Sequence, residues 1–249
     1  MARAMARGWG EPVLCSDSGS GRARALVAEL GGQALSSREV VERADLVVLC
    51  HKPYQLEQVA RDIGLTDKPI ASVLGTTPIE KLQGAYPNSQ VFALMPNTPV
   101  EVRRGVVIYA DRDPDSSNAV DPATETQVLE LFERLGTVIR LPKRLLEAAA
   151  AVTSVGPAYQ ALLAEAQVDA AVRHGLSAAL AGRLLVETMV GSAELLANRD
   201  YDTLAVRREV TSPAGSTARG LDALERAGVR SAFQDAIDAV VRPTGQGGS

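Results

Sequence analysis

The stretch Ala44-Asp-Leu-Val-Val-Leu-Cys50 decides the fold class. It is an apolar run, and such a run is typical of a β-strand that is buried on both faces. Strands of this kind belong to parallel sheets that are covered by helices on each side. The sequence therefore predicts an α/β fold around this strand.

Strand and helix patterns alternate on both sides of this stretch. Further strands are predicted at residues 13–16, 69–74, 91–94, 106–109 and 137–141. Helices are predicted at residues 22–30, 55–63, 78–83 and 125–135, where apolar residues recur at helical spacing. This alternation predicts βαβ units and a parallel sheet with helices on both faces.

The pattern changes near Pro142, after which no convincing strand follows. Residues 145–173 and 178–198 are long, rich in Ala and Leu, and apolar at a three-to-four spacing. Two helices this apolar need a partner surface, either within one bundle or across a dimer. The predicted domains are residues 1–142, an α/β domain, and 143–241, an all-helical domain. Residues 242–249 have the composition of a disordered tail.

Composition excludes several classes of function. The 249 residues are 46% hydrophobic with a net charge of −4 and no basic block, so a nucleic-acid groove is not expected. No apolar run approaches the roughly 20 residues that cross a bilayer, and no secretory signal is visible. Cys15 and Cys50 lie in strand-like runs, which predicts reduced thiols and a cytoplasmic protein. His51 and His174 are the only histidines, so no metal site is predicted.

The loop Val210-Thr-Ser-Pro-Ala-Gly-Ser-Thr217 precedes a predicted helix at residues 218–227. Backbone N–H groups at such a junction, with the helix dipole behind them, form an anion site that suits a carboxylate. The alternative is a plain helix start, since Ser and Thr are common N-caps.

Residues 208–228, which contain this loop, resemble the signature of pyrroline-5-carboxylate reductases. These enzymes make proline by reducing a cyclic imine with a nicotinamide cofactor. Three other segments agree in family order: Val48-Leu-Cys-His-Lys-Pro53, Met95-Pro-Asn-Thr-Pro99 and residues 151–159. The resemblance implies a Rossmann-like parallel sheet followed by an all-helical domain that forms an interlocked homodimer. It also implies the last step of proline biosynthesis.

The resemblance assigns site residues in both halves of the chain. In the helical half, the substrate carboxylate and ring nitrogen would be held by Thr211, Ser212, Gly215, Ser216 and Thr217, of which Thr217 would hydrogen-bond the nitrogen and relay a proton. In the family, this loop meets the nucleotide domain of the partner subunit. Cofactor contacts are implied for Ser16, Asp17, Ser18, Lys52, Pro53, Met95, Pro96, Asn97 and Thr98. These segments follow strands, where ligands of open α/β sheets bind.

The segment around Asp17 carries signals for both nicotinamide cofactors. An acidic residue after the second family strand binds the ribose 2′-OH and favours NAD, whereas small hydroxyls or an arginine accommodate a 2′-phosphate. Asp17 therefore favours NAD, while Ser16, Ser18 and Arg22 favour NADP. NADP is expected because the family often uses it, and NAD is left open.

The family register places Met1 inside the glycine loop of the dinucleotide fingerprint, with Ala2 at the third glycine. The first strand and first two glycines are thus expected to be missing from these residues, and the neighbouring strands to have unpaired edges. Two explanations stay open: an internal Met of a longer protein, or a chain that lacks the strand and binds nucleotide poorly.

Several residues depart from the family pattern. Ala214 replaces the usual Gly after Ser-Pro, Ala93 replaces a frequent Arg, and residues 153–156 read Thr-Ser-Val-Gly. Two alternative functions therefore remain beside the reductase. One is a reductase of a related imine, and the other is a non-catalytic paralogue that acts as a binding module.

Overall fold

The structure is a computed structural model that describes residues 1–75, 77–111 and 120–241. The chain forms two compact units, Met1–Ser154 (unit 1) and Val155–Ser249 (unit 2). The division into compact units falls after Ser154, because the helix that precedes Ser154 contacts the sheet of unit 1. The predicted domain boundary near Pro142 stays a prediction. The predicted tail at 242–249 lies outside the described residues.

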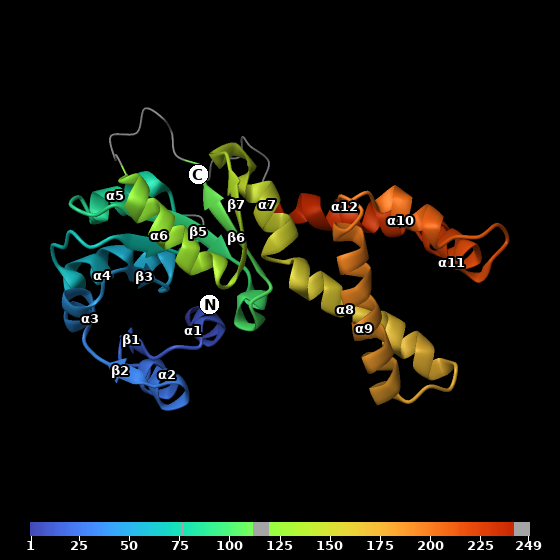
Figure 1. Cartoon of the computed structure of the whole chain (residues 1–249), viewed down its shortest axis with the longest axis horizontal. Helices are drawn as coiled ribbons and strands as arrows, with labels where there is room; N and C mark the ends of the chain where they lie inside the picture. The colour runs from blue at the N-terminus through green and yellow to red at the C-terminus, as the bar shows by residue number, and fades with distance from the viewer. Residues whose placement is uncertain (76, 112–119, 242–249) are drawn as a thin grey trace. The chain divides into compact units, whose positions relative to one another are not determined.

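Unit 1 alternates strands and helices along its described chain, as predicted (Figure 1). Its strands are β1 (Val13–Cys15), β2 (Gly32–Ala34), β3 (Val47–Leu49), β4 (Ile70–Ser72), β5 (Val91–Pro96), β6 (Gly105–Ala110) and β7 (Gly136–Leu141). Its α-helices are α1 (Ala2–Trp9), α2 (Arg22–Leu30), α3 (Ser37–Arg43), α4 (Leu56–Ile63), α5 (Ile79–Ala85), α6 (Pro122–Glu133) and α7 (Leu146–Thr153). Short 3-10 turns η1 (Pro53–Gln55), η2 (Thr98–Val102) and η3 (Lys143–Leu145) lie between them.

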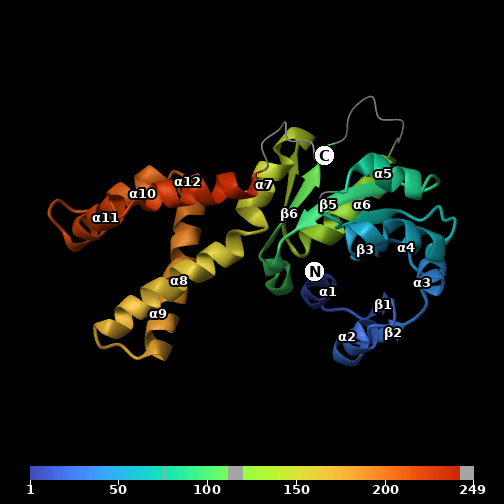
Figure 2. The same ribbon diagram turned by 180° about the vertical axis from the view of Figure 1, so that it is seen from behind.

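The strands of unit 1 form two separate sheets. β1 and β2 pair in parallel, and the other five strands follow the order β3-β4-β5-β6-β7. Among the described residues β1 therefore pairs only with β2, and β3 only with β4. This confirms the expected unpaired edges. The β1–β2 pair lies apart from the larger sheet in both views (Figures 1 and 2).

The larger sheet is parallel, as predicted, except at one pair of strands. β6 runs antiparallel to β5, with Leu94 opposite Tyr109, whereas the other pairs are parallel. The reason is the connection: only η2 and its flanking turns separate the two strands, and a parallel crossover needs a dozen residues or more. The short link forces the chain to turn back beside β5.

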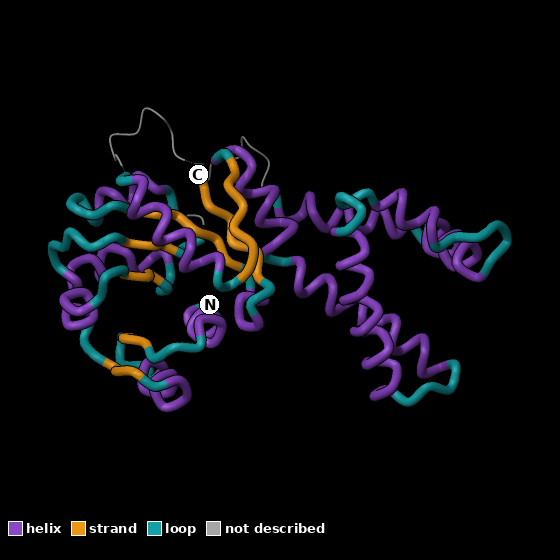
Figure 3. The backbone as a smooth tube through the Cα atoms, viewed as in Figure 1, coloured by secondary structure: helices purple, strands orange, loops and turns teal. Residues whose placement is uncertain are grey.

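Helices pack beside the larger sheet (Figure 3), and two clusters of buried apolar side chains lie between these helices and the strands. One cluster contains Met5 of α1 and Phe132 of α6 against β5 and β6, and the other contains Leu56 of α4 and Leu82 of α5 against β3 and β4. Helix α1 packs closely against η2 because Gly8 has no Cβ. A Cβ built on Gly8 would lie 2.1 Å from the carbonyl oxygen of Val100. A side chain at this position would push α1 away from η2.

Unit 2 is all-helical, as predicted. Its helices are α8 (Gly156–Arg173), α9 (Ala178–Ala197), α10 (Thr203–Glu209), α11 (Ser216–Arg226) and α12 (Val229–Val240). The single helix predicted at 145–173 is wrong, because it is interrupted between α7 and α8. Pro157 causes the interruption: a helical proline lacks the N–H for the carbonyl four residues earlier and its ring clashes with that carbonyl.

Unit 2 buries very little of its own surface. Ala181 is the one side chain of its described residues that is buried, while Leu162 and Val186 are 65% and 55% exposed. No helix in the described ranges is long and apolar enough to cross a bilayer.

Candidate functional site

Two of the three segments with predicted cofactor residues lie at one edge of the larger sheet, whereas Ser16, Asp17 and Ser18 follow β1 of the two-stranded sheet. β3, β4 and β5 are parallel neighbours, so their carboxyl ends share an edge. Lys52 and Pro53 follow β3, and the segment from Met95 to Thr98 ends β5 and begins η2. The structure therefore brings together two segments that lie far apart in the sequence (Figure 1).

The turn after β3 has a fixed backbone and an exposed lysine. The Lys52 N–H donates to Gln55 Oε1 at 3.0 Å, and the Lys52 carbonyl oxygen accepts from Gln55 N–H at 2.9 Å. His51 Nδ1 lies 2.9 Å from the same carbonyl oxygen, and its Nε2 is buried without a hydrogen-bond partner. These hydrogen bonds use only the backbone of Lys52, so its exposed ammonium group is available to bind a ligand.

Asn97 is buried and its side chain is engaged by the protein itself. Its exposed fraction is 8%. Oδ1 accepts from Val106 N–H at 2.8 Å, and Nδ2 donates to the carbonyl oxygen of Thr153 at 3.1 Å. Sequence reasoning missed Thr153, although Pro157 four residues later was a signal that its carbonyl has no helical donor. Thr98, next in the chain, is exposed.

Asp17 holds its own loop together after β1. One carboxylate oxygen accepts from Gly19 N–H and the other from Ala23 N–H, both at 2.7 Å. These bonds, the one from Ala23 first, lower the pKa of Asp17. Ser16 Oγ lies 2.8 Å from Ser37 Oγ. Both carboxylate oxygens are occupied by backbone, and Ser18, Ser20 and Arg22, the first residue of α2, are exposed polar residues beside them.

The start of α1 lies beside the end of β3. Burial raises the pKa of the Cys50 thiol to about 12, and the terminal amino group is close enough to lower it slightly. Cys15 is also a free thiol, as predicted. Met1 is the N-cap of α1, and no side chain forms a hydrogen bond to the first-turn amides of this helix.

The predicted substrate loop lies in unit 2, between α10 and α11. Gly215 is the N-cap of α11, and no side chain caps the helix, so its first-turn amides are free for an anion. Thr211 Oγ1 is buried without a hydrogen-bond partner. A Cβ on Gly215 would lie 2.4 Å from Ser212 Oγ, so a side chain here would require this hydroxyl group to rotate away. Ser216 and Thr217 form the first turn, and both are exposed.

Ala214 adopts the conformation that favours glycine. Its φ is +57°, in the left-handed region. The Arg219 guanidinium donates to the Ala214 carbonyl oxygen at 2.9 Å, which holds the turn. The loop therefore keeps a glycine-like path despite the departure from the family pattern.

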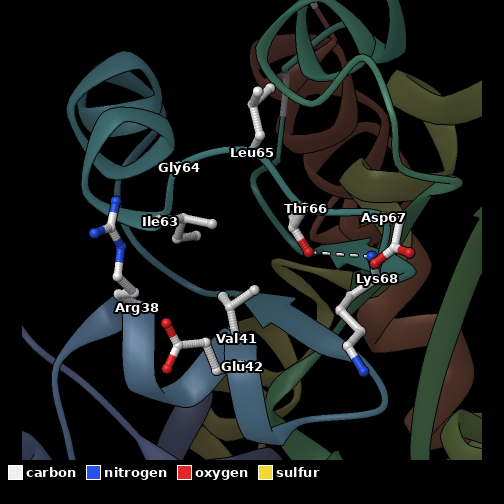
Figure 4. A pocket seen from close by; sticks show the side chains of 9 residues that line it. All are labelled: Arg38, Val41, Glu42, Ile63, Gly64, Leu65, Thr66, Asp67 and Lys68. Carbon is white, nitrogen blue, oxygen red and sulfur yellow. Dashed lines mark hydrogen bonds between the residues drawn. The ribbon is translucent and has the colours of Figure 1, made fainter.

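A cavity of about 330 Å³ lies elsewhere in unit 1 (Figure 4). It is lined by α3 and by the segment between α4 and β4, including Arg38, Glu42 and Leu65. This segment leads into the amino end of β4, so the cavity is at the edge opposite to Lys52. None of the predicted site residues line it.

Two family models match the chain. Residues 1–75 match the model described as NADP oxidoreductase coenzyme F420-dependent, and residues 143–246 match the model described as pyrroline-5-carboxylate reductase dimerisation. The second match contains the whole loop before α11. The described residues contain no group of three or more His, Cys, Asp or Glu that could hold a metal ion.

Curated relatives decide the family. A pyrroline-5-carboxylate reductase of Synechocystis sp. is 31% identical over 208 residues, which are 83% of this chain and 76% of the relative. The reductase of Mycobacterium tuberculosis is 34% identical over 82% of this chain and 77% of its own length. The chain belongs to the pyrroline-5-carboxylate reductase family. In this family, the solved Plasmodium falciparum enzyme with NADP bound is 26% identical and has a TM-score of 0.81 over 96% of this chain and 90% of its own.

Proposed function

We propose that this protein reduces 1-pyrroline-5-carboxylate to L-proline, the last step of proline biosynthesis, with NADPH as the reductant. Family membership supports the reaction, and the uncapped start of α11 is the observation that supports the substrate. The substrate carboxylate would accept from the first-turn amides of α11 and from the Thr211 hydroxyl, whose oxygen is buried without a partner.

The reaction needs orientation more than acid–base chemistry. NADPH, when bound, supplies the hydride that adds to the iminium carbon, and the electron pair of the C=N bond moves to the nitrogen, which is already protonated. Thr217 would hydrogen-bond this nitrogen and pass the proton between it and water. A positioned, electrophilic substrate accounts for most of the rate in such a step.

The residues of unit 1 fit an NADP cofactor at three points. The 2′-phosphate would lie by Ser18 and Arg22, because Asp17 is occupied by backbone amides. The phosphates would meet the first-turn amides of α1. Lys52 and the turn after β5 would contact the ribose and nicotinamide. The sides of this part of the cofactor site would be formed by Pro53, Met95, Pro96 and Thr98. The solved relative that has NADP bound supports this choice over NAD.

Two copies would be needed for a complete site. The dimerisation model matches residues 143–246 and supports a homo-oligomer. We propose that the loop before α11 serves the cofactor domain of the other copy, as the family resemblance implies. A place in the cytoplasm stays a prediction from the free cysteines.

The test is consumption of NADPH by the purified chain with 1-pyrroline-5-carboxylate. Thr217→Ala should lower kcat about 10- to 100-fold, because the variant loses a hydrogen bond to a charged group, and should leave the affinity for NADPH unchanged. Thr203→Ala, an exposed threonine at the start of α10, is the matched control. Unchanged kcat in Thr217→Ala removes this residue from the mechanism. NADPH binding without turnover of this substrate would favour a related imine, and no binding would favour the non-catalytic paralogue.

A further inference from the structure

The hydrogen bond between Asn97 and Thr153 joins two distant parts of unit 1. Asn97 follows β5 at the carboxyl edge of the sheet, and Thr153 is the last residue of α7, just before unit 2 begins. The side-chain Nδ2 donates to the Thr153 carbonyl oxygen at 3.1 Å across 56 positions of sequence. This bond holds the C-terminal end of α7 against the edge of the sheet that carries Lys52.

The sequence leaves this carbonyl available. In a continuous helix, the Thr153 carbonyl would accept from the N–H four residues later, but that residue is Pro157, which has none. The chain instead turns at Ser154, and α8 begins at Gly156. Asn97 supplies the missing donor. The proline that ends α7 thus creates the acceptor that the asparagine uses.

Asn97 itself is held rigidly from four sides. Its Oδ1 accepts from Val106 N–H at 2.8 Å, its N–H donates to the Val106 carbonyl oxygen at 3.1 Å, and its carbonyl accepts from Val100 N–H at 3.3 Å. Ala151, two residues before the end of α7, is 0% exposed. The amide therefore cannot swing to another partner without the loss of a buried hydrogen bond.

We infer that Asn97 is a positioning residue: it anchors the end of α7, from which the chain enters the helical unit, to the cofactor edge of the sheet. Its amide acts through Thr153 and not on the cofactor. This inference rests on the proposed reductase activity. It predicts that the bond is needed for turnover but not for NADPH binding, because its partner is the chain that leads to unit 2.

The variant Asn97→Asp separates these effects. The introduced carboxyl group keeps an acceptor for Val106 N–H but has no donor at neutral pH and places an oxygen against the Thr153 carbonyl oxygen. The expected result is a kcat about tenfold lower, with the Kd of NADPH within about twofold of the parent. Asn88→Asp adds the same charge at an exposed position of unit 1 and should behave as the parent. An equal loss of NADPH affinity, or an unchanged kcat, would overturn the inference.

A second variant approaches the same bond from the other side. Pro157→Ala provides an N–H that competes with Asn97 for the Thr153 carbonyl, and it should lower kcat in the same direction. Hydrogen exchange of Asn97→Asp gives a readout that needs no activity: amides in the last turn of α7 should exchange faster than in the parent, while those of β3 and β4 do not. If the parent proves inactive, the reductase proposal fails, and unchanged exchange in α7 would separately overturn the anchor.

Discussion

Unit 1 and unit 2 differ in how they bury their apolar side chains. Unit 1 buries two apolar clusters between its helices and the strands of its larger sheet, and Phe132 and Leu82 are 0% exposed. Unit 2 buries one described side chain, Ala181, and leaves Leu184 and Val190 more than half exposed. Folding has to offset a conformational entropy of about 1–2 kcal/mol per residue, which a unit with so little burial cannot do alone. Unit 2 needs a second surface, and the dimerisation family model supports another copy of the chain.

The largest effect is expected from a charge placed on the exposed apolar surface of unit 2. Leu184 is 51% exposed in the single chain. If a second copy covers it, Leu184→Asp buries an unpaired charge at each side of the interface and should weaken dimerisation by at least about 100-fold. Sedimentation velocity across a concentration series measures this. Leu65→Asp, at a residue of unit 1 that is 83% exposed, is the control. An unchanged dimer would place the interface elsewhere.

The next prediction tests whether the stability of unit 1 is independent of association between chains. Phe132 is fully buried, with its ring 5.7 Å from that of Trp9 in an edge-to-face arrangement. Phe132→Ala should destabilise the fold by about 3–5 kcal/mol through the cavity that it leaves. Because the loss lies within one chain, the fall in stability should be the same at every protein concentration. Phe233→Ala in unit 2, at a residue that is 38% exposed, should instead give a Tm change that depends on concentration.

A smaller effect concerns ligand binding by unit 1. Arg22 is exposed on the loop that Asp17 organises. Arg22→Ala should raise the Kd of NADPH about tenfold, as expected for a lost charged hydrogen bond, and leave that of NADH unchanged. Fluorescence titration measures both constants, and Arg24→Ala on the same helix is the control. Equal changes for both nucleotides would remove Arg22 from the 2′-phosphate site.

Backbone strain also separates the units. Of the described non-glycine residues with positive φ, Arg103 lies in unit 1, whereas Asp200, Tyr201 and Ala214 lie in unit 2. Ala214→Gly should relieve the strain and stabilise the fold by about 1 kcal/mol, reduced by the greater freedom of glycine when unfolded. Thermal unfolding checks the sign. A lower Tm would mean that the entropy of glycine outweighs the strain.

The smallest effect is a dependence on pH in unit 1. The pKa of Asp17 is lowered, chiefly by the Ala23 N–H, so the ionised group stabilises the loop above its ordinary pKa of 3.8. This contribution is lost as pH falls through the lowered pKa. Asp17→Asn should therefore have a lower Tm than the parent at neutral pH, and the difference should close under strong acid. A constant difference would point to another cause.

The sequence predicted the elements whose patterns are local. Helix α2 was predicted at residues 22–30, where it occurs, and the unpaired edges followed from the family register. Helix α3 was missed, although Ser36 and Glu39 form a capping box that is readable in the sequence. The interruption before α8 was also readable from Pro157.

Other features could not be read from local pattern. The strand β2 is short and fully exposed, so no apolar period marks it. The family resemblance implied a cofactor contact for Asn97, in agreement with its place after a strand, and this role stays a prediction. The bond from Asn97 to Thr153 depends on how the chain folds back over 56 residues. Pro157 signals that the Thr153 carbonyl lacks a helical donor, but the sequence alone does not show that Asn97 supplies it.

The activity of a mixed dimer shows whether each site is completed by two chains. One copy would carry Lys52→Ala in unit 1 and the other Thr217→Ala in unit 2, with two different tags for purification. If the loop of one copy serves the cofactor edge of the other, one of the two sites contains only parent residues, and the mixed dimer should have about half of the parent activity. If it is as inactive as the two single variants, both halves of a site come from one chain and the account is contradicted.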